Sequence, residues 1–311
     1  WSSACALPIC PIPKEEFDWK AIQKKIENNP FITDKKAKPR VLTITQSTYD
    51  GVLYNVEMIK EMLDGKVDTL HFDEAWLPHA TFHDFYKDMH AIGKDRPRPK
   101  DSIVFSTQST HKLLAGLSQA SQILVQDSDS HQLDNDCFNE SYLMHTSTSP
   151  QYAIIASCDV AAAMMEPPGG TALVEESIQE SLDFRRAMRK VDEEYGRDWW
   201  FQVWGPDVLV DDGIGRADNW IIKGAGKGPK WHGFGKIEDG FNMLDPIKAT
   251  IVTPGLDLNG KFDKTGIPAS IVTKFLAEHG VIVEKTGLYS FFIMFTRSEE
   301  HTSELQSHHD L

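Results

Sequence analysis

The sequence predicts an α/β protein with a parallel, doubly wound sheet in its larger part and an α+β domain in its smaller part. Between residues 40 and 127, short runs rich in β-branched residues alternate with stretches of helical spacing. After residue 150 the texture changes to a small apolar stretch, a long amphipathic stretch and several strand-like runs. We therefore expect one domain over residues 1–150 and a second over residues 151–296.

The first predicted domain alternates strands with helices. A helix is predicted over residues 49–65, because Val52, Val56, Ile59 and Leu63 recur at helical spacing. A second helix is predicted over residues 110–121. Strands are predicted at residues 40–48, 67–76, 102–109 and 122–127. Ligands of such sheets bind beyond the carboxyl ends of the strands, which is where residues 73–76 and 106–112 fall.

The second predicted domain begins with helices. They are predicted over residues 149–165, 171–196 and 267–280, with a break at the Pro- and Gly-rich residues 167–170. The buried side of the second helix is predicted to carry Leu173, Ile178, Leu182, Met188 and Val191. Strands are predicted at residues 198–204, 248–255, 281–287 and 288–295. Residues 205–240 are predicted to be mostly loops, with Trp231 and His232 as packing groups.

The composition argues against some partners. The formal net charge of −14 is unfavourable for non-specific binding of nucleic acid, which requires a basic face. No apolar run reaches the ~18 residues of a membrane span. His79 and His83 have a metal-like spacing on a helix, but no third ligand is evident, and no metal site is predicted. The chain has four cysteines, Cys5, Cys10, Cys137 and Cys158. They lack the spacing of a zinc site, and this usage favours a reducing, cytoplasmic compartment.

Both ends of the chain look atypical. The first residues include no initiator Met and no recognisable start of a helix or strand, so we expect the chain to be a piece of a longer protein. Residues 297–311 are polar and have no pattern. Residues 297–308 resemble the translation of a sequencing adapter, and a non-native tail is predicted there.

Lys112 is the residue whose position is most informative. It lies near the start of the predicted helix at 110–121, where the helix dipole is unfavourable for a positive charge. A lysine that attacks a carbonyl must be neutral part of the time, and burial beside a helix N-terminus lowers its pKa. The same N-terminus offers N–H groups to a phosphate, next to the donors of Ser109 and His111.

A carbonyl and a phosphate on one small ring point to pyridoxal 5′-phosphate (PLP). This cofactor also needs an acid opposite its ring nitrogen, and Asp73 at the end of the predicted strand 67–76 is the candidate. Each feature by itself has a plainer interpretation. Lys112 can be a surface lysine on a capped helix, and Asp73 can be a turn or cap residue.

The motifs resemble those of the bacterial ornithine/lysine/arginine decarboxylases, which are PLP enzymes of fold type I. The similarity begins with STQSTHKLLAGLSQAS at residues 106–121 and spans residues 8–296 in the same order. The other matching segments are STYDGVLYN (47–55), LHFDEAW (70–76), HTSTSPQYAIIAS (145–157), WHGF (231–234), LDPIKATIVTPG (244–255) and VEKTGLYS (283–290). Seven collinear motifs make the resemblance specific.

This resemblance implies roles for individual residues. Lys112 would form the Schiff base with the cofactor, and Asp73 would bind the pyridine nitrogen. Ser109 and His111 would contact the phosphate, with Trp76 packing close to it. Thr148 or Ser149 would reach the neighbouring subunit's site, the alternative being a capped helix start. Glu284 would face the distal amine of the substrate, the alternative being a solvated residue at a strand end. Further cofactor and substrate roles are thus spread over Trp76, Ser109, His111, Thr148 and Glu284.

The implied reaction is decarboxylation of a basic amino acid, with lysine ranked first, then arginine, then ornithine. The alternatives are another PLP reaction, such as transamination, and a catalytically silent relative that binds a partner subunit. The resemblance also implies at least a homodimer with shared sites. The family's upstream phosphate-binding loop and its ring-stacking histidine have no counterpart in this chain. We therefore expect the chain by itself to bind PLP weakly and to turn over poorly.

Overall fold

A computed structural model describes residues 11–94, 96–196, 199–206, 219–224, 231–234, 237–258 and 261–296. The chain divides into two compact units. The first unit comprises residues 13–47 and 55–171, and the second comprises the described residues of 11–12, 48–54 and 172–296. The division therefore falls near residue 171 and not at residue 150, because helices expected in the second domain pack with the first. The tail at 297–311 lies outside the described residues.

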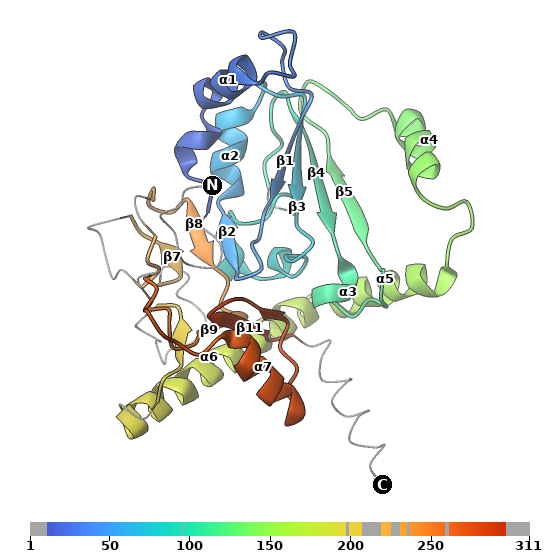
Figure 1. The fold of residues 1–311 in the computed structure, drawn as a ribbon. Helices are drawn as coiled ribbons and strands as arrows, with labels where there is room; N and C mark the ends of the chain where they lie inside the picture. The colour runs from blue at the N-terminus through green and yellow to red at the C-terminus, as the bar shows by residue number, and fades with distance from the viewer. Residues whose placement is uncertain are drawn as a thin grey trace. The chain divides into compact units, whose positions relative to one another are not determined.

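The first unit is an α/β layer on a four-stranded sheet of order β1-β3-β4-β5 (Figure 1). The strands are β1 (Val41–Thr45), β3 (Thr69–Asp73), β4 (Ile103–Gln108) and β5 (Gln122–Gln126). The α-helices are α1 (Trp19–Asn28), α2 (Val56–Leu63), α3 (Thr110–Leu113), α4 (Asn135–His145) and α5 (Tyr152–Met164), and the short 3-10 helices are η1 (Lys14–Phe17), η2 (Ala80–Phe82) and η3 (Asp84–Tyr86).

The predicted strands are all present, but the sheet is only partly parallel. β1, β3 and β4 are parallel, and β3 places Asp73 opposite Thr45 on one side and Thr107 on the other. β5 pairs with β4 in the antiparallel direction, contrary to prediction. The cause is the connection, which contains only the single turn α3, whereas a parallel return needs a full crossover.

Two predicted helices were too long. The helix expected over residues 49–65 begins at Val56, where the Asn55 side chain accepts a hydrogen bond from the Met58 N–H and caps it. Val52, expected on its apolar face, lies instead on β2 (Val52–Tyr54), which pairs with the second unit's β8. The helix expected over residues 110–121 ends at Leu113, and its backbone then folds back so that the His111 N–H donates to the Ala120 carbonyl.

The second unit contains two antiparallel sheets, of order β10-β11-β9-β6 and β2-β8-β7. Its remaining strands are β6 (Gln202–Trp204), β7 (Ile221–Ile222), β8 (Asn242–Leu244), β9 (Lys248–Val252), β10 (Lys285–Thr286) and β11 (Ser290–Met294). Its helices are α6 (Gly169–Tyr195), whose first residues belong to the first unit, and α7 (Ala269–Glu278). The predicted strand at 281–287 is reduced to two paired residues in β10, and Gly280, just after α7, has a positive φ.

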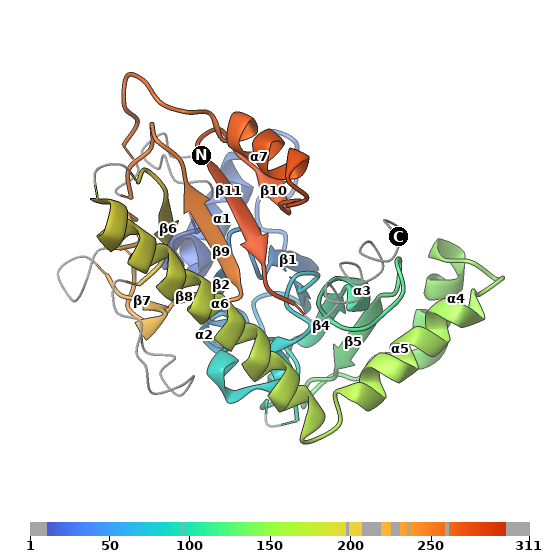
Figure 2. The ribbon, with the colours of Figure 1, turned by 90° about the horizontal axis from the view of Figure 1, so that it is seen from below.

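Helix α6 covers the sheet that contains β9 (Figure 2). Of its predicted apolar side, Ile178 and Leu182 are buried, and Leu173, Met188 and Val191 are half-buried. Arg185 on the same side is also buried, because its guanidinium donates to the backbone carbonyls of Trp204 and Lys248. Within the described ranges, no helix is both long and apolar enough to span a membrane.

Phe72 offers a test of the first unit's core. It lies in the middle of the sheet on β3 and is fully buried. Phe72→Ala should lower the free energy of unfolding by about 3–5 kcal/mol, because a cavity replaces the ring. Chemical denaturation measures this, and Phe31→Ala at a 91% exposed position is the control. A loss for Phe72→Ala as small as the control's would mean that the sheet is not packed as described.

Candidate active site

Asp73 is the last residue of β3, and its carboxylate is half-buried. Its Oδ1 accepts a hydrogen bond from the Ala75 N–H at 3.1 Å, which holds the carboxylate over the turn that follows the strand. In the register of the sheet, Asp73 lies opposite Thr107 on β4. The predicted end-of-strand position of Asp73 is therefore confirmed.

Lys112 follows the neighbouring strand. It lies on α3, which begins directly after β4, and its side chain is half-buried. The Lys112 ammonium lies 4.2 Å from the centroid of the Trp76 ring, in the geometry of a cation–π contact. Trp76 belongs to the turn after β3, so this contact joins the two strand ends. The structure thus brings Lys112 and Trp76 together beside the strand that ends in Asp73.

The helix argument for Lys112 needs correction. α3 has four residues, so few peptide dipoles align at its start and the argument from the helix dipole does not apply. The Ser109 side chain makes no capping hydrogen bond to α3. The His111 Nδ1 lies 2.8 Å from the Ala120 carbonyl, which can only accept, so Nδ1 carries a proton.

The other residues singled out in the sequence are exposed or have local partners. Thr148 is exposed in the segment between α4 and α5. Glu284 is exposed in the second unit, where its N–H donates to the Phe292 carbonyl. His79 is buried against the Tyr86 ring, and the His83 Nδ1 accepts from the Phe85 N–H. Over the described ranges, no group of metal-binding side chains is found.

Sequence reasoning missed Glu74, the residue next to Asp73. Its side chain is fully buried, and its carboxylate accepts hydrogen bonds from Ser106 Oγ at 2.6 Å, Gln108 Nε2 at 2.9 Å and the Ala91 N–H at 2.5 Å. Burial raises the pKa of Glu74, and the three donors oppose that rise. The signal that could have found it is the strict alternation of LHFDEAW, which places Glu74 on the inner face with Phe72.

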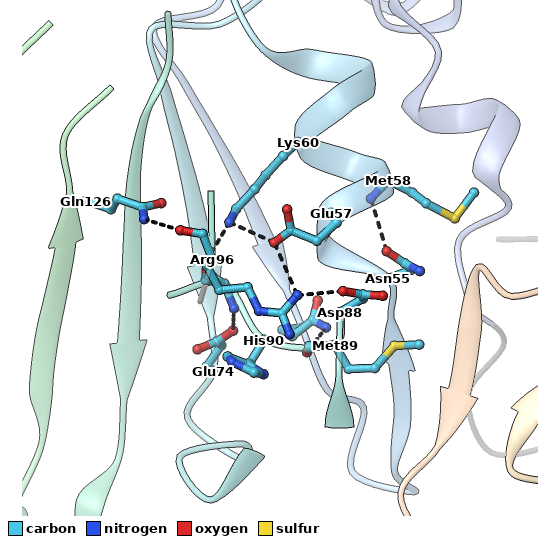
Figure 3. Close-up of polar contacts among 12 residues, drawn as sticks. Asn55, Glu57, Met58, Lys60, Glu74, Asp88, Met89, His90, Arg96 and Gln126 are labelled. Carbon is cyan, nitrogen blue, oxygen red and sulfur yellow. Dashed lines mark hydrogen bonds and ion pairs between the residues drawn. The ribbon is translucent and has the colours of Figure 1, made fainter. Parts of the chain in front are cut away.

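A cluster of charges lies beside Glu74 (Figure 3). The Lys60 Nζ on α2 donates to the Ala91 carbonyl at 2.6 Å and to the Glu57 carboxylate at 3.1 Å. The Arg96 guanidinium binds the Asp88 carboxylate at 2.6 Å. Burial lowers the pKa of Lys60, and the Glu57 charge opposes that effect. The cluster therefore keeps two buried or half-buried cations within reach of the acidic groups around them.

Comparisons with known proteins assign the chain to a class. A family model described as Orn/Lys/Arg decarboxylase, major domain, matches residues 6–303. The chain belongs to this family of amino-acid decarboxylases, which confirms the resemblance found in its motifs. The match also extends into the segment for which a non-native tail is predicted.

Within the family, the chain is most like lysine decarboxylases. Lysine decarboxylase LdcA of Pseudomonas aeruginosa is 49% identical over 290 residues, which are 93% of this chain and 38% of that protein. The biodegradative arginine decarboxylase of Escherichia coli is 38% identical, over 93% of this chain and 40% of that protein. The solved structure of lysine decarboxylase A from Pseudomonas aeruginosa has a TM-score of 0.85 at 45% identity, covering 98% of this chain and 41% of that one. The chain thus spans about two fifths of the length of these relatives.

His90, in the charged cluster, predicts a pH dependence of stability. Burial and the nearby Arg96 guanidinium lower the pKa of His90 to about 4. Between the ordinary histidine pKa and that value, the unfolded chain binds a proton that the folded chain does not. Stability should therefore fall as the pH drops through this range, by on the order of 3 kcal/mol.

The measurement is the free energy of unfolding between pH 7 and pH 4, for the unmodified chain and for His90→Asn. The difference between the two proteins isolates the histidine, because the other titrating groups are common to both. We expect the two curves to converge as the pH falls. Parallel curves would mean that His90 titrates normally in the folded chain.

Proposed function

We propose that this chain carries the cofactor centre of a decarboxylase that acts on a basic amino acid with pyridoxal 5′-phosphate. The observation that carries the proposal is the parallel pairing of β3 and β4. Because the two strands are parallel, they end at the same edge of the sheet, β3 with Asp73 and β4 just before the segment that holds Lys112. Family membership supports the reaction class. The first unit would belong to the large domain of a fold type I enzyme. The cysteine usage favours a cytoplasmic one.

Asp73 fits the role of partner to a protonated ring nitrogen. The Ala75 N–H occupies Oδ1 of its carboxylate, and Oδ2 can accept a hydrogen bond from the cofactor. The carboxylate is half-buried, so its attraction to a pyridinium N–H is screened less than it would be in bulk water. A cationic partner would also offset the cost of holding this charge at the end of an apolar strand.

Lys112 fits the role of the residue that binds the cofactor covalently. Its Nζ is kept beside the strand ends by the Trp76 ring, and an amine there can attack an aldehyde when it loses its proton. Ser109, the N-cap residue of α3, would donate its hydroxyl to the phosphate, and His111 within α3 is the second proposed phosphate contact. Thr148 is the further proposed ligand, supplied to the site of a neighbouring copy.

The bound cofactor would accept the electron pair that is released when the bond between the α-carbon and the carboxylate breaks. Asp73 would hold the proton on the ring nitrogen, which the cofactor needs in order to accept these electrons. The Lys112 Nζ would deliver a proton to the α-carbon after CO₂ has left. Trp76 is buried and would exclude water from one side of the Lys112 amine.

We rank lysine first as the substrate, then arginine, then ornithine. The support is the higher identity to a lysine decarboxylase, 49%, than to an arginine decarboxylase, 38%. Glu284 is the proposed partner of the substrate's distal cation, because a carboxylate is the side chain that compensates an amine taken out of water. The product would be the corresponding diamine or, from arginine, agmatine.

We also propose that a second copy of the chain covers α5. This helix is mostly apolar, with Asp159 as its one charged residue, yet much of it is open to water. Its exposed large apolar residues are Tyr152, Ile155, Val160 and Met164. A helix of this composition is normally buried, so a partner surface is expected. Thr148 lies four residues before α5, which would bring it to the boundary between the two copies.

Reduction with borohydride tests the role of Lys112. The chain is mixed with PLP, reduced and mapped by peptide mass, with a chain extended to the length of its relatives in parallel. A phosphopyridoxyl group should appear on Lys112, and Lys112→Ala should remove both this adduct and lysine-dependent CO₂ release. Asp73→Ala should keep the adduct but lose turnover by roughly 100-fold or more, the scale of a positioned proton-transfer group.

Lys100→Ala, at an exposed lysine, is the control for this experiment. It should leave the adduct and the rate unchanged. Adducts spread over surface lysines in the extended chain would contradict the assignment of Lys112. A keto acid in place of an amine would indicate a different PLP reaction, and an adduct without any product would favour a silent relative.

The oligomer is tested at Ile155. Light scattering should give the mass of a dimer or a larger assembly, because apolar α5 is sheltered by a second copy. Ile155→Asp should weaken the assembly by more than about 10-fold, since a charge then replaces an apolar contact. Ile271→Asp, at a similarly exposed residue of α7, is the matched control. An equal effect of both variants, or of neither, would contradict the proposed surface.

A further inference from the structure

Glu74 joins three segments that are distant in sequence. Ser106 and Gln108 come from β4, and Ala91 comes from the loop that follows η3. These donors lie 32, 34 and 17 residues from Glu74 along the chain. A carboxylate that accepts three hydrogen bonds in a fully buried position fixes the three segments relative to one another, since breaking any of them leaves a buried polar group unsatisfied.

The same strand presents Asp73 on the opposite face. Successive side chains of a strand alternate between faces, so Phe72 and Glu74 point inward while Asp73 points outward. On β4 the same alternation puts Ser106 and Gln108 on the inner face and Thr107 on the outer face, opposite Asp73. Anchoring on the inner face therefore sets the position of Asp73 without touching it.

The anchor continues from Glu74 to Lys112 through the backbone. The Glu74 N–H donates to the Thr107 carbonyl, and its own carbonyl accepts from the Leu77 N–H in the turn that carries Trp76. Gln108 directly precedes Ser109, the N-cap residue of α3. The Gln108 Oε1 accepts a hydrogen bond from Gln122 Nε2 on β5, so β4 is also held on the side away from β3.

The opposite end of the anchor is held by a cation. Ala91 donates its N–H to Glu74 and accepts from Lys60 Nζ through its carbonyl, so one residue links the carboxylate to the lysine. The loop is held further by the Gln46 side chain, which donates to the Met89 carbonyl. The backbone of the loop at Met89 and Ala91 therefore has little freedom to move away from Glu74.

We propose that Glu74 is a positioning residue, whose three hydrogen bonds hold the ends of β3 and β4 so that Asp73 and Lys112 keep the separation that the cofactor requires. The use of this arrangement for PLP rests on the proposed function. Glu74 itself touches neither reacting atom. Its effect arises because a displacement of about 1 Å in a catalytic group can cost about 100-fold in rate.

Glu74→Gln tests the proposal with little change in shape. The amide has one acceptor oxygen in place of two, so its NH₂ group must face either the Ala91 N–H or the donors of Ser106 and Gln108. We expect the affinity for PLP, measured by fluorescence titration of the apoprotein, to fall by about 10-fold or more, the scale of a lost hydrogen bond to a charged group. In the extended chain, kcat for lysine should fall more than KM rises.

Glu57→Gln is the matched control. Glu57 lies on α2 and binds Lys60 and Arg96, and in the described part of the chain it forms no hydrogen bond or ion pair with β3 or β4. Both variants remove one carboxylate from the same cluster, and both can lower the thermal midpoint. Only Glu74→Gln should weaken PLP binding and shift kcat, whereas Glu57→Gln should stay within about twofold of the unmodified protein.

Hydrogen exchange of the apoprotein separates this proposal from the proposed function. Peptides that contain residues 73–76 and 107–112 should exchange faster in Glu74→Gln and not in Glu57→Gln. Unchanged exchange together with unchanged PLP affinity in Glu74→Gln would overturn the positioning role. If the unmodified extended chain takes up no PLP, the proposed function fails, and the exchange data alone decide whether Glu74 holds the two strand ends.

Discussion

The alternation of side chains at the end of β3 is the constraint on which the candidate site depends. Phe72 and Glu74 are committed to the inner face, so Asp73 between them has only the outer face. Parallel pairing with β4 then places Thr107 beside Asp73 and directs the chain into the turn that carries Lys112. A register shift of one residue would bury Asp73 and expose Glu74, which would abolish both the site and its anchor.

Burying Glu74 is costly, and the surrounding structure compensates for it locally. Three donors surround the carboxylate, and Lys60 reaches the same loop residue, Ala91, from α2. A buried carboxylate without such partners would be strongly destabilising. The inner face of the first unit's sheet therefore combines apolar side chains with the hydrogen-bonded connection that links Glu74 to Lys60 through Ala91. This connection lies on the face opposite Asp73, where it can be satisfied fully without competing for a ligand.

The differences from the predicted fold have local causes. Val52 fits a helical pattern because its spacing to Val56 is four residues, but Asn55 caps α2 and leaves Val52 to pair with Leu244 on β8. The segment after Lys112 is apolar enough for a helix, yet the chain must return to pair β5 with β4, and only one turn forms. Periodicity cannot detect such competition, since the winning partner is a strand far away in the sequence.

By itself the sequence determined the strands β1, β3 and β4, the position of Asp73 at a strand end, and the membership of the chain in a decarboxylase family through its collinear motifs. Only the tertiary structure decided that Lys112 packs on Trp76, that β5 is antiparallel, and that Glu74 anchors the site. The physical reason is range. Strand identity is encoded in neighbouring residues. The partners of Glu74 lie 17 to 34 residues away in the sequence and meet only once the register of the sheet and the position of Ala91 are set.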